Sequence, residues 1–256
     1  SGSGSFTPST NSLGGDYVPS AADTAAGNVT LTLTTTGNGS CNAYTDNVII
    51  TFTDIPTVNA GLDQSICADI ANVPLGGAVT IATGGTWTTS GTGTFTPNNT
   101  SIGASYIPSN GDTTAGSVTL TLTTTGNGLC NAYTDQMTVT ISPTPIANAG
   151  VDQTVCADIS AVNLSGTVIN AGGGIWTTTG TGTFSPNNTT LNGNYIPSSG
   201  DTLSGAVTLT LTSTGNGTCN TYNNAIVITF TNAPTVDAGA DITACQDIAS
   251  IPLSGS

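Results

Sequence analysis

The most regular pattern in the chain is an alternation of apolar residues with threonine. In 118–123, Val or Leu occupies every second position and Thr the positions between, and 207–211 repeats this order. The stretches 137–141 and 226–230 also carry an apolar residue at every second position. Side chains two residues apart lie on one face of a strand, so each stretch is predicted to be a strand with one buried face. The segment 126–131 contains an Asn-Gly step and is predicted to be the turn between two of these strands.

The whole chain repeats with a period of 89 residues and without insertion or deletion. Three sets of residues are each spaced by 89 positions: Cys41, Cys130 and Cys219; Cys67, Cys156 and Cys245; and Asp23, Asp112 and Asp201. A fixed period of this kind is the mark of a tandem array, in which each repeat is one structural module.

Proline-containing segments are predicted to divide the modules. They lie at 54–57, 142–145 and 232–235, and proline lacks the N–H that a central strand requires. We therefore expect 1–55 to be the C-terminal part of a preceding module, 56–144 and 145–233 to be complete modules, and 234–256 to be the N-terminal part of a following module.

Each complete module is predicted to be all-β, with an immunoglobulin-like (Ig-like) sandwich fold. Seven or so short strands in about 90 residues, separated by turns, are typical of this sandwich. Trp87 and Trp176 fall on the third strand of their modules. A tryptophan at that place packs in the core, so we expect both to be core residues rather than a stacking platform for sugar.

Composition narrows the functions open to the chain. It has 14 acidic residues, all Asp, and no Lys, Arg or His, which gives a formal net charge of −14. Nucleic-acid binding needs cationic side chains that pair with phosphate, and this chain has none. It also lacks His and Lys, which are the usual general bases and Schiff-base amines of enzymes. No apolar run approaches the roughly 18 residues of a membrane-spanning helix. We therefore expect no enzymatic activity, no nucleic-acid partner and no membrane insertion.

The six cysteines occur two per repeat, which favours disulfides formed in an oxidising compartment over a zinc site. In an Ig-like sandwich, the first strand and the hairpin between the last two strands are expected to place their cysteines at the same pole. This predicts the bonds Cys67–Cys130 and Cys156–Cys219, and leaves Cys41 and Cys245 to partners outside the sequence. A rival pairing, Cys41 with Cys67, would instead staple neighbouring modules together.

Carboxylates recur just after the proline-containing segments, at Asp63, Asp152 and Asp241. Asn or Asp side chains lie nearby in each repeat, and oxygen ligands of this kind suit Ca²⁺. A calcium ion held by these carboxylates is therefore a hypothesis, and the alternative is that each Asp stabilises a turn. We expect no other cofactor.

Three longer stretches carry a resemblance to a known family. They read Ala-Gly-Leu-Asp-Gln-Ser-Ile-Cys from residue 60, Gly-Thr-Trp-Thr-Thr-Ser-Gly-Thr-Gly-Thr-Phe-Thr-Pro-Asn-Asn-Thr from 85, and Ala-Gly-Ser-Val-Thr-Leu-Thr-Leu-Thr-Thr-Thr-Gly-Asn-Gly-Leu-Cys-Asn from 115. The chain resembles the PKD-like or Ig-like tandem repeats of Bacteroidota cell-surface proteins, which include gliding-motility adhesins and substrates of the type IX secretion system. The resemblance implies an extracellular, cell-surface location and a filament or stalk of many modules, without catalytic residues.

A glycosylation hypothesis follows from the same resemblance. Thr24, Thr113 and Thr202 each follow an Asp, in tripeptides similar to the O-glycosylation acceptors of secreted Bacteroidota proteins. These three threonines are therefore candidate O-glycosylation sites. The alternative is that the preceding Asp only stabilises a turn.

Together these patterns predict a structural repeat segment of an extracellular surface fibre, filament or adhesin stalk. Its partners would be neighbouring modules, copies of the same protein, and a surface or glycan that the sequence does not identify. One alternative is a polymer subunit in which 234–256 and 1–55 of different chains rebuild a sandwich, with Cys245 bonded to Cys41. The missing Trp segment at such a junction counts against it. The other alternative is a carbohydrate-binding spacer of a secreted enzyme.

Overall fold

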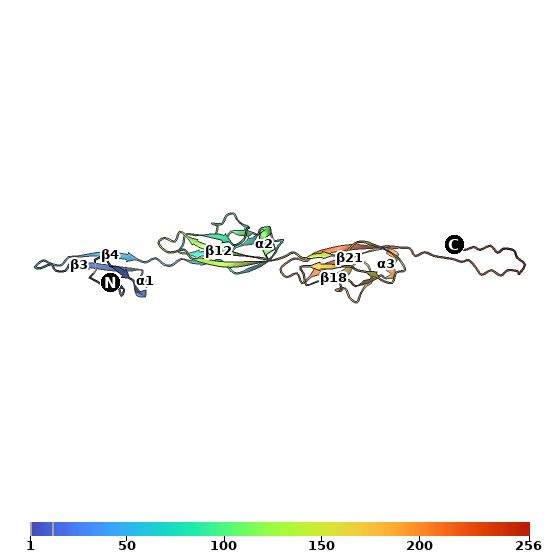
Figure 1. The fold of residues 1–256 in the computed structure, drawn as a ribbon, viewed down its shortest axis with the longest axis horizontal. Coiled ribbons are helices and arrows are strands. Elements are labelled where there is room, and N and C mark those ends of the chain that lie inside the picture. The colour runs from blue at the N-terminus through green and yellow to red at the C-terminus, as the bar shows by residue number, and fades with distance from the viewer. Residues whose placement is uncertain (1, 12) are drawn as a thin grey trace. The chain divides into compact units, whose positions relative to one another are not determined.

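The computed structural model describes residues 2–11 and 13–256, and strands make up most of its regular structure (Figure 1). By their contacts the residues form two compact units. One unit consists of Ser1–Gln64, Asn72–Ser109 and Val118–Val139, and the other of Ser65–Ala71, Asn110–Ser117 and Thr140–Ser256. Among the described residues, no helix is long and apolar enough to cross a membrane.

Each of the two repeats that the sequence predicts as modules, 56–144 and 145–233, contains nine strands and one short helix. Module 56–144 has β5 (Thr57–Asn59), β6 (Gln64–Cys67), β7 (Val73–Pro74), β8 (Ala78–Thr80), β9 (Gly84–Thr89), β10 (Thr94–Thr96), β11 (Ser105–Ile107), α2 (Asn110–Ala115), β12 (Ser117–Thr125) and β13 (Thr134–Ser142). Module 145–233 has β14 (Ile146–Asn148), β15 (Gln153–Cys156), β16 (Val162–Asn163), β17 (Thr167–Ile169), β18 (Gly173–Thr178), β19 (Thr183–Ser185), β20 (Asn194–Ile196), α3 (Ser199–Ser204), β21 (Ala206–Thr214) and β22 (Asn223–Thr231).

The strands of each module form two main sheets. In module 145–233 the order is β15-β22-β21-β18 in one sheet and β16-β20-β19 in the other, and β14 pairs with β17. Module 56–144 repeats the same two orders, as β6-β13-β12-β9 and β7-β11-β10. The β15–β22 pair is parallel, with Cys156 opposite Thr231, whereas β22–β21 and β21–β18 are antiparallel.

The core of module 145–233 lies between its two sheets. Along β21, Val207, Leu209 and Leu211 are buried and the threonines between them are half-exposed, as the alternation predicts. Ile228 of β22 and Tyr195 of β20 join the same cluster of buried side chains. Burying one such apolar side chain stabilises the fold by about 1.5–3 kcal/mol. The predicted all-β, Ig-like sandwich is therefore confirmed.

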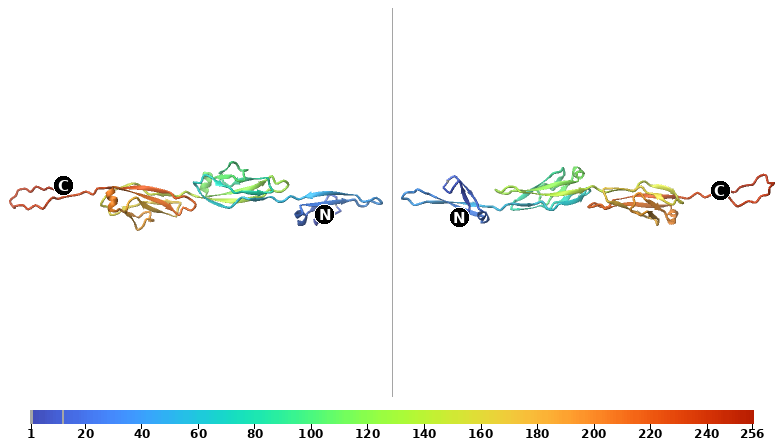
Figure 2. Two further views of the ribbon diagram at one scale, coloured as in Figure 1. Left: turned by 180° about the vertical axis from the view of Figure 1, so that it is seen from behind. Right: turned by 60° about the horizontal axis from the view of Figure 1, so that its bottom comes forward.

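The two ends of the chain carry less structure. Residues 1–55 form two antiparallel hairpins, β1 (Ser5–Thr7) with β2 (Asp16–Val18) and β3 (Asn28–Thr34) with β4 (Thr45–Thr51), and the helix α1 (Ala21–Ala25). Residues 234–256, coloured red in Figure 2, form an extended loop without a helix or strand.

Candidate functional site

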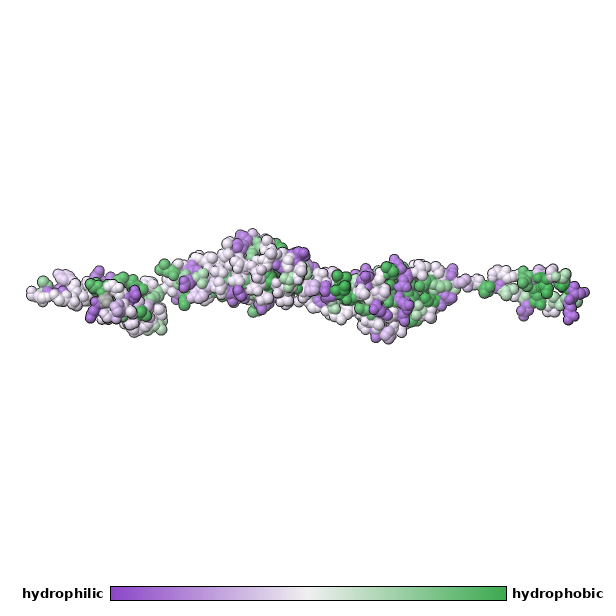
Figure 3. All heavy atoms as spheres, in the orientation of Figure 1, coloured by the Kyte–Doolittle hydropathy of each residue, from purple (hydrophilic) through white to green (hydrophobic). Residues whose placement is uncertain are grey.

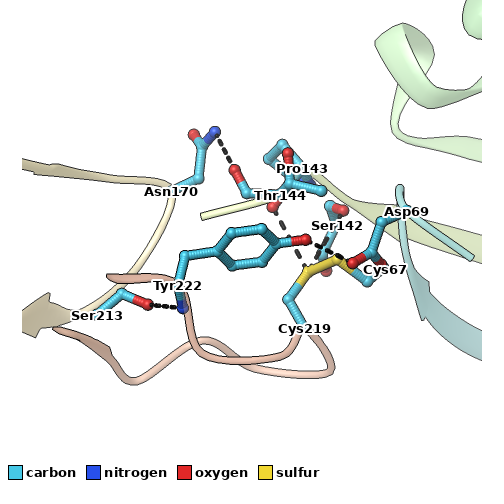
Figure 4. The surroundings of a disulfide bond; sticks show 9 residues. All are labelled: Cys67, Asp69, Ser142, Pro143, Thr144, Asn170, Ser213, Cys219 and Tyr222. Carbon is cyan, nitrogen blue, oxygen red and sulfur yellow. Dashed lines mark hydrogen bonds between the residues drawn. A yellow bond between two sulfur atoms is a disulfide. The ribbon is translucent and has the colours of Figure 1, made fainter. Parts of the chain in front are cut away.

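A disulfide that joins consecutive repeats is the most distinctive chemical feature of the molecule. It links Cys67, at the end of β6, to Cys219, in the loop between β21 and β22 (Figure 4). The two cysteines are 152 residues apart, which is one full period more than the predicted spacing. The predicted bonds Cys67–Cys130 and Cys156–Cys219 are therefore wrong, and Cys130 and Cys156 are both unpaired.

The parallel pairing of β15 with the last strand, β22, explains the error. In module 145–233, Cys156 lies beside Thr231 at the end of β22, whereas Cys219 precedes the start of β22 at Asn223. The two ends of the nine-residue strand β22, one near each cysteine, are about 25 Å apart, at roughly 3.3 Å per residue. A disulfide requires Cα atoms within about 7 Å, so the two cysteines of one module cannot bond to each other.

Hydrogen bonds and contacts position Cys219 for this bond. The backbone N–H of Tyr222 donates to Ser213 Oγ at 2.9 Å, which fixes the base of the β21–β22 loop. Cys219 Sγ lies 3.6 Å from the carbonyl oxygen of Pro143. The hydroxyl of Tyr222 donates to a carboxylate oxygen of Asp69 at 2.6 Å, next to the disulfide (Figure 4). This bond to an anion raises the pKa of Tyr222.

The same geometry recurs one period earlier, around a cysteine without a partner. Cys130 Sγ lies 3.4 Å from Thr53 Oγ1 and 3.6 Å from the carbonyl oxygen of Asp54. These two residues are the counterparts, 89 positions earlier, of Ser142 and Pro143 beside Cys219. The loop that holds Cys130 is thus placed as the loop of Cys219 is. Cys41 and Cys245 are also unpaired and are exposed, so the structure does not contain the rival bond Cys41–Cys67.

The repeated Asp of the Asp-Thr tripeptides has a structural role. Asp201 is buried, and its carboxylate accepts hydrogen bonds from the Tyr195 hydroxyl at 2.7 Å and from three backbone N–H groups at 2.8–2.9 Å. Burial opposes ionisation, but the Ser198 N–H, the Tyr195 hydroxyl and the Thr181 N–H together lower the pKa of Asp201 to about 2. Ser198 and Asp201 also form a capping box at the start of α3.

The threonines that follow these aspartates lie at the surface. Thr24 is exposed, and Thr113 and Thr202 are half-exposed. Each hydroxyl donates to a backbone carbonyl three residues earlier, at 2.9–3.1 Å. A surface hydroxyl with this weak local bond is accessible to modification, so O-glycosylation stays a prediction.

The aspartates considered for calcium do not come together. Asp63 accepts a hydrogen bond from the Thr138 N–H at 2.7 Å, and Asp152 accepts one from the Val227 N–H at 2.8 Å. Asp241 is exposed in the C-terminal loop. Among the described residues, no group of three or more carboxylates or other metal-binding side chains is close enough to hold an ion. The carboxylates of Asp63 and Asp152 act instead as acceptors for the last strand of their module.

Both tryptophans are buried in the cores. Trp87 is 0% and Trp176 is 1% exposed, and their indole N–H groups donate to the carbonyls of Ile102 and Leu191, at 3.0 and 3.2 Å respectively. A Cβ on Gly166 would lie 2.8 Å from Trp176 Cζ2, so only glycine leaves room for the indole. Neither ring is available for stacking on a sugar, which removes the basis of the carbohydrate-binding alternative.

Comparison with known proteins finds distant matches among solved structures alone. No protein-family model matches the chain, and no curated protein matches it. Among solved structures, Drosophila N-cadherin EC1-4 is 11% identical with a TM-score of 0.41, over 73% of this chain and 52% of that one. Mouse cadherin-23 EC22-24 is 12% identical with a TM-score of 0.39, over 86% of this chain and 79% of that one. The D00-D0 domain of intimin is 14% identical with a TM-score of 0.39, over 68% of this chain and 99% of that one. The chain thus spans about half the length of the N-cadherin fragment.

Proposed function

We propose that this chain is a structural repeat segment of an extracellular surface fibre, filament or adhesin stalk. The observation that carries the proposal is the bond between Cys67 and Cys219, because it ties β6 of one repeat to the β21–β22 loop of the next. A bond placed in this way transmits tension from module to module. A disulfide also persists best in an oxidising, extracellular compartment.

The sequence supports the same role. The absence of Lys and Arg leaves no site for trypsin-like proteases, which suits a surface that faces them. The resemblance to Bacteroidota repeats supports a cell-surface location, export by the type IX system and a role in adhesion or gliding. On this proposal, the partners of the chain are neighbouring modules and copies of the same protein, and the distal ligand is a surface or a glycan.

Stretching a single molecule of residues 1–256 from its two ends tests this role. The disulfide bridges 152 residues, and an extended chain spans about 3.3–3.6 Å per residue. The intact bond should therefore prevent about 500 Å of chain between the two cysteines from extending under force. Reductant, or Cys67→Ser with Cys219→Ser, should release that length. The matched control Cys41→Ser should leave the extension unchanged. If the oxidised and reduced chains yield the same final length, the bond does not carry tension and the proposal fails.

A further inference from the structure

The bond between Cys67 and Cys219 is not the bond that an unfolded chain would form first. Cys41 and Cys67 are 26 residues apart in the sequence, whereas Cys67 and Cys219 are 152 residues apart. Loop closure becomes less favourable with about the 3/2 power of loop length, so the shorter loop would close roughly 14 times more readily. The structure contains the longer loop, and Cys41 is unpaired. The folded modules, rather than the unfolded chain, therefore select the partners of this bond.

The loop that carries Cys219 takes its position without help from a disulfide. Cys130, one period earlier, is unpaired, and its Sγ atom lies 3.6 Å from the carbonyl oxygen of Asp54. Cys219 Sγ lies 3.6 Å from the carbonyl oxygen of Pro143, which is the counterpart of Asp54. The loop cysteine has the same position with and without a bond, so non-covalent contacts are sufficient to place it.

The linker 142–145 anchors both cysteines of the bond. The N–H of Ala68 donates to the carbonyl oxygen of Ser142 at 2.8 Å, directly after Cys67 in the sequence. Cys219 Sγ lies 3.8 Å from the same oxygen. A single anchor leaves the segments on either side free to turn about it. A second contact is needed to hold the two sulfur atoms in line.

Tyr222 and Asp69 provide this second contact. The Tyr222 hydroxyl donates to a carboxylate oxygen of Asp69 at 2.6 Å, and Figure 4 shows the ring alongside the disulfide. Asp69 follows Cys67 by two residues and Tyr222 follows Cys219 by three, so this hydrogen bond restrains both cysteines closely.

The composition of the chain makes such a contact distinctive. Without Lys, Arg or His, no ion pair between side chains can orient one repeat on the next. Threonine, serine and glycine are abundant, and much of the surface has the intermediate hydropathy drawn white in Figure 3. A hydrogen bond to a carboxylate is about twice as strong as one between neutral groups, so it is well suited to orient two repeats that carry no cation.

The β21–β22 loop also covers the end of β6. Cys67 is 1% exposed, whereas Cys156, which has the same place in the next module, is half-exposed. The loop thus packs closely on β6 and does not touch it through the disulfide alone.

We infer that Tyr222 and Asp69 are positioning residues that dock the β21–β22 loop on the end of β6 before oxidation, and so select Cys67 and Cys219 as partners. The inference rests on the proposed function, in which this bond joins consecutive repeats. With oxidised glutathione, one cysteine thiolate attacks the glutathione disulfide and releases one reduced glutathione. The other thiolate then attacks the mixed disulfide and releases a second. Docking favours this last step, because it raises the effective concentration of one thiol at the other.

Oxidation of the chain 1–256 in a glutathione redox buffer measures that effective concentration. After equilibration, free thiols are alkylated and the chain is cut with a protease that cleaves before Asp. This places Cys67 on peptide 63–68 and Cys219 on peptide 201–236, so the ratio of joined to separate peptides reports the bond. Tyr222→Phe should lower the effective concentration about tenfold, the factor expected for a solvent-exposed hydrogen bond to a charged acceptor.

Variants on both sides of the hydrogen bond distinguish a lost contact from a fault in folding. Asp69→Ala removes the acceptor from one repeat and Tyr222→Phe removes the donor from the next, so each should have the same effect as the two together. Tyr133→Phe and Asp158→Ala make the same changes one period away and are the matched controls, which should leave the Cys67–Cys219 bond unchanged.

The outcomes separate this inference from the proposed function. Single variants that oxidise as readily as the parent chain, or effects that multiply in the double variant, would overturn the positioning role. The disulfide and the proposed function would then still stand. A parent chain that forms Cys41–Cys67 in place of Cys67–Cys219 would overturn both.

Discussion

Replacing Asp201 by Asn should destabilise module 145–233 by about 3–5 kcal/mol. The Tyr195 hydroxyl and the N–H groups of Gly182 and Ser198 donate to Oδ2, and the Thr181 N–H donates to Oδ1. An amide has one oxygen, so its NH₂ group must face at least one of these donors. A bond to a charged acceptor contributes about 1.5–3 kcal/mol and a neutral one about 1 kcal/mol. One bond lost, at about 1.5–3 kcal/mol, and three bonds weakened by about 0.5 kcal/mol each together give about 3–5 kcal/mol.

Urea unfolding followed by tryptophan fluorescence measures this change. The chain has two tryptophans, so a Trp87→Phe background leaves Trp176 as the reporter of module 145–233. Asp241→Asn in the exposed C-terminal loop removes the same charge and is the matched control, expected to change the free energy of unfolding by less than about 0.5 kcal/mol. A loss of less than about 1 kcal/mol for Asp201→Asn would refute the account of Asp201 as a buried acceptor of four hydrogen bonds.

Four further outcomes follow from the same structure. Because the pKa of Asp201 is lowered from 3.8 to about 2 on folding, its contribution to stability is present above pH 4 and lost as the pH falls towards 2; unfolding curves across this range should show the loss, and Asp201→Asn should reduce it. Trp176→Ala should cost about 3–5 kcal/mol in urea unfolding, since the ring is fully buried, and a loss below about 1 kcal/mol would contradict a core role. Asp69→Asn should lower the pKa of Tyr222, which a spectrophotometric titration against the parent chain would detect; an unchanged titration curve would exclude the hydrogen bond. The intact mass of the native protein should exceed the sequence mass by sugar-sized increments, and Thr202→Ala should remove one of them; an unmodified mass would leave the Asp-Thr turns with a structural role alone.

The sequence could not reveal the short helices by their periodicity, but it did contain a local signal for α1 and α3. Residues 110–115 and 199–204 show no apolar period, because each helix is a single turn or so in length. The pair Ser198 and Asp201 has the spacing of a capping box, and the structure forms that box. The tripeptide pattern drew attention to Asp201 as a neighbour of a glycosylation site. Its burial, and the Tyr195 hydroxyl that reaches it from β20, depend on contacts between segments.

By itself, the sequence determined the class of fold, the period and the residues of the core. Alternation along 118–123 and 207–211 fixes which side chains can share a face, because the geometry of a strand has a period of two. The tertiary structure alone decided which cysteines meet. In an array with an 89-residue period, the same six positions permit a bond across 63 residues or across 152, and the spacing favours neither. The parallel pairing of β15 with β22 separates the cysteines of one module by the length of a strand, and so directs the bond to the next module.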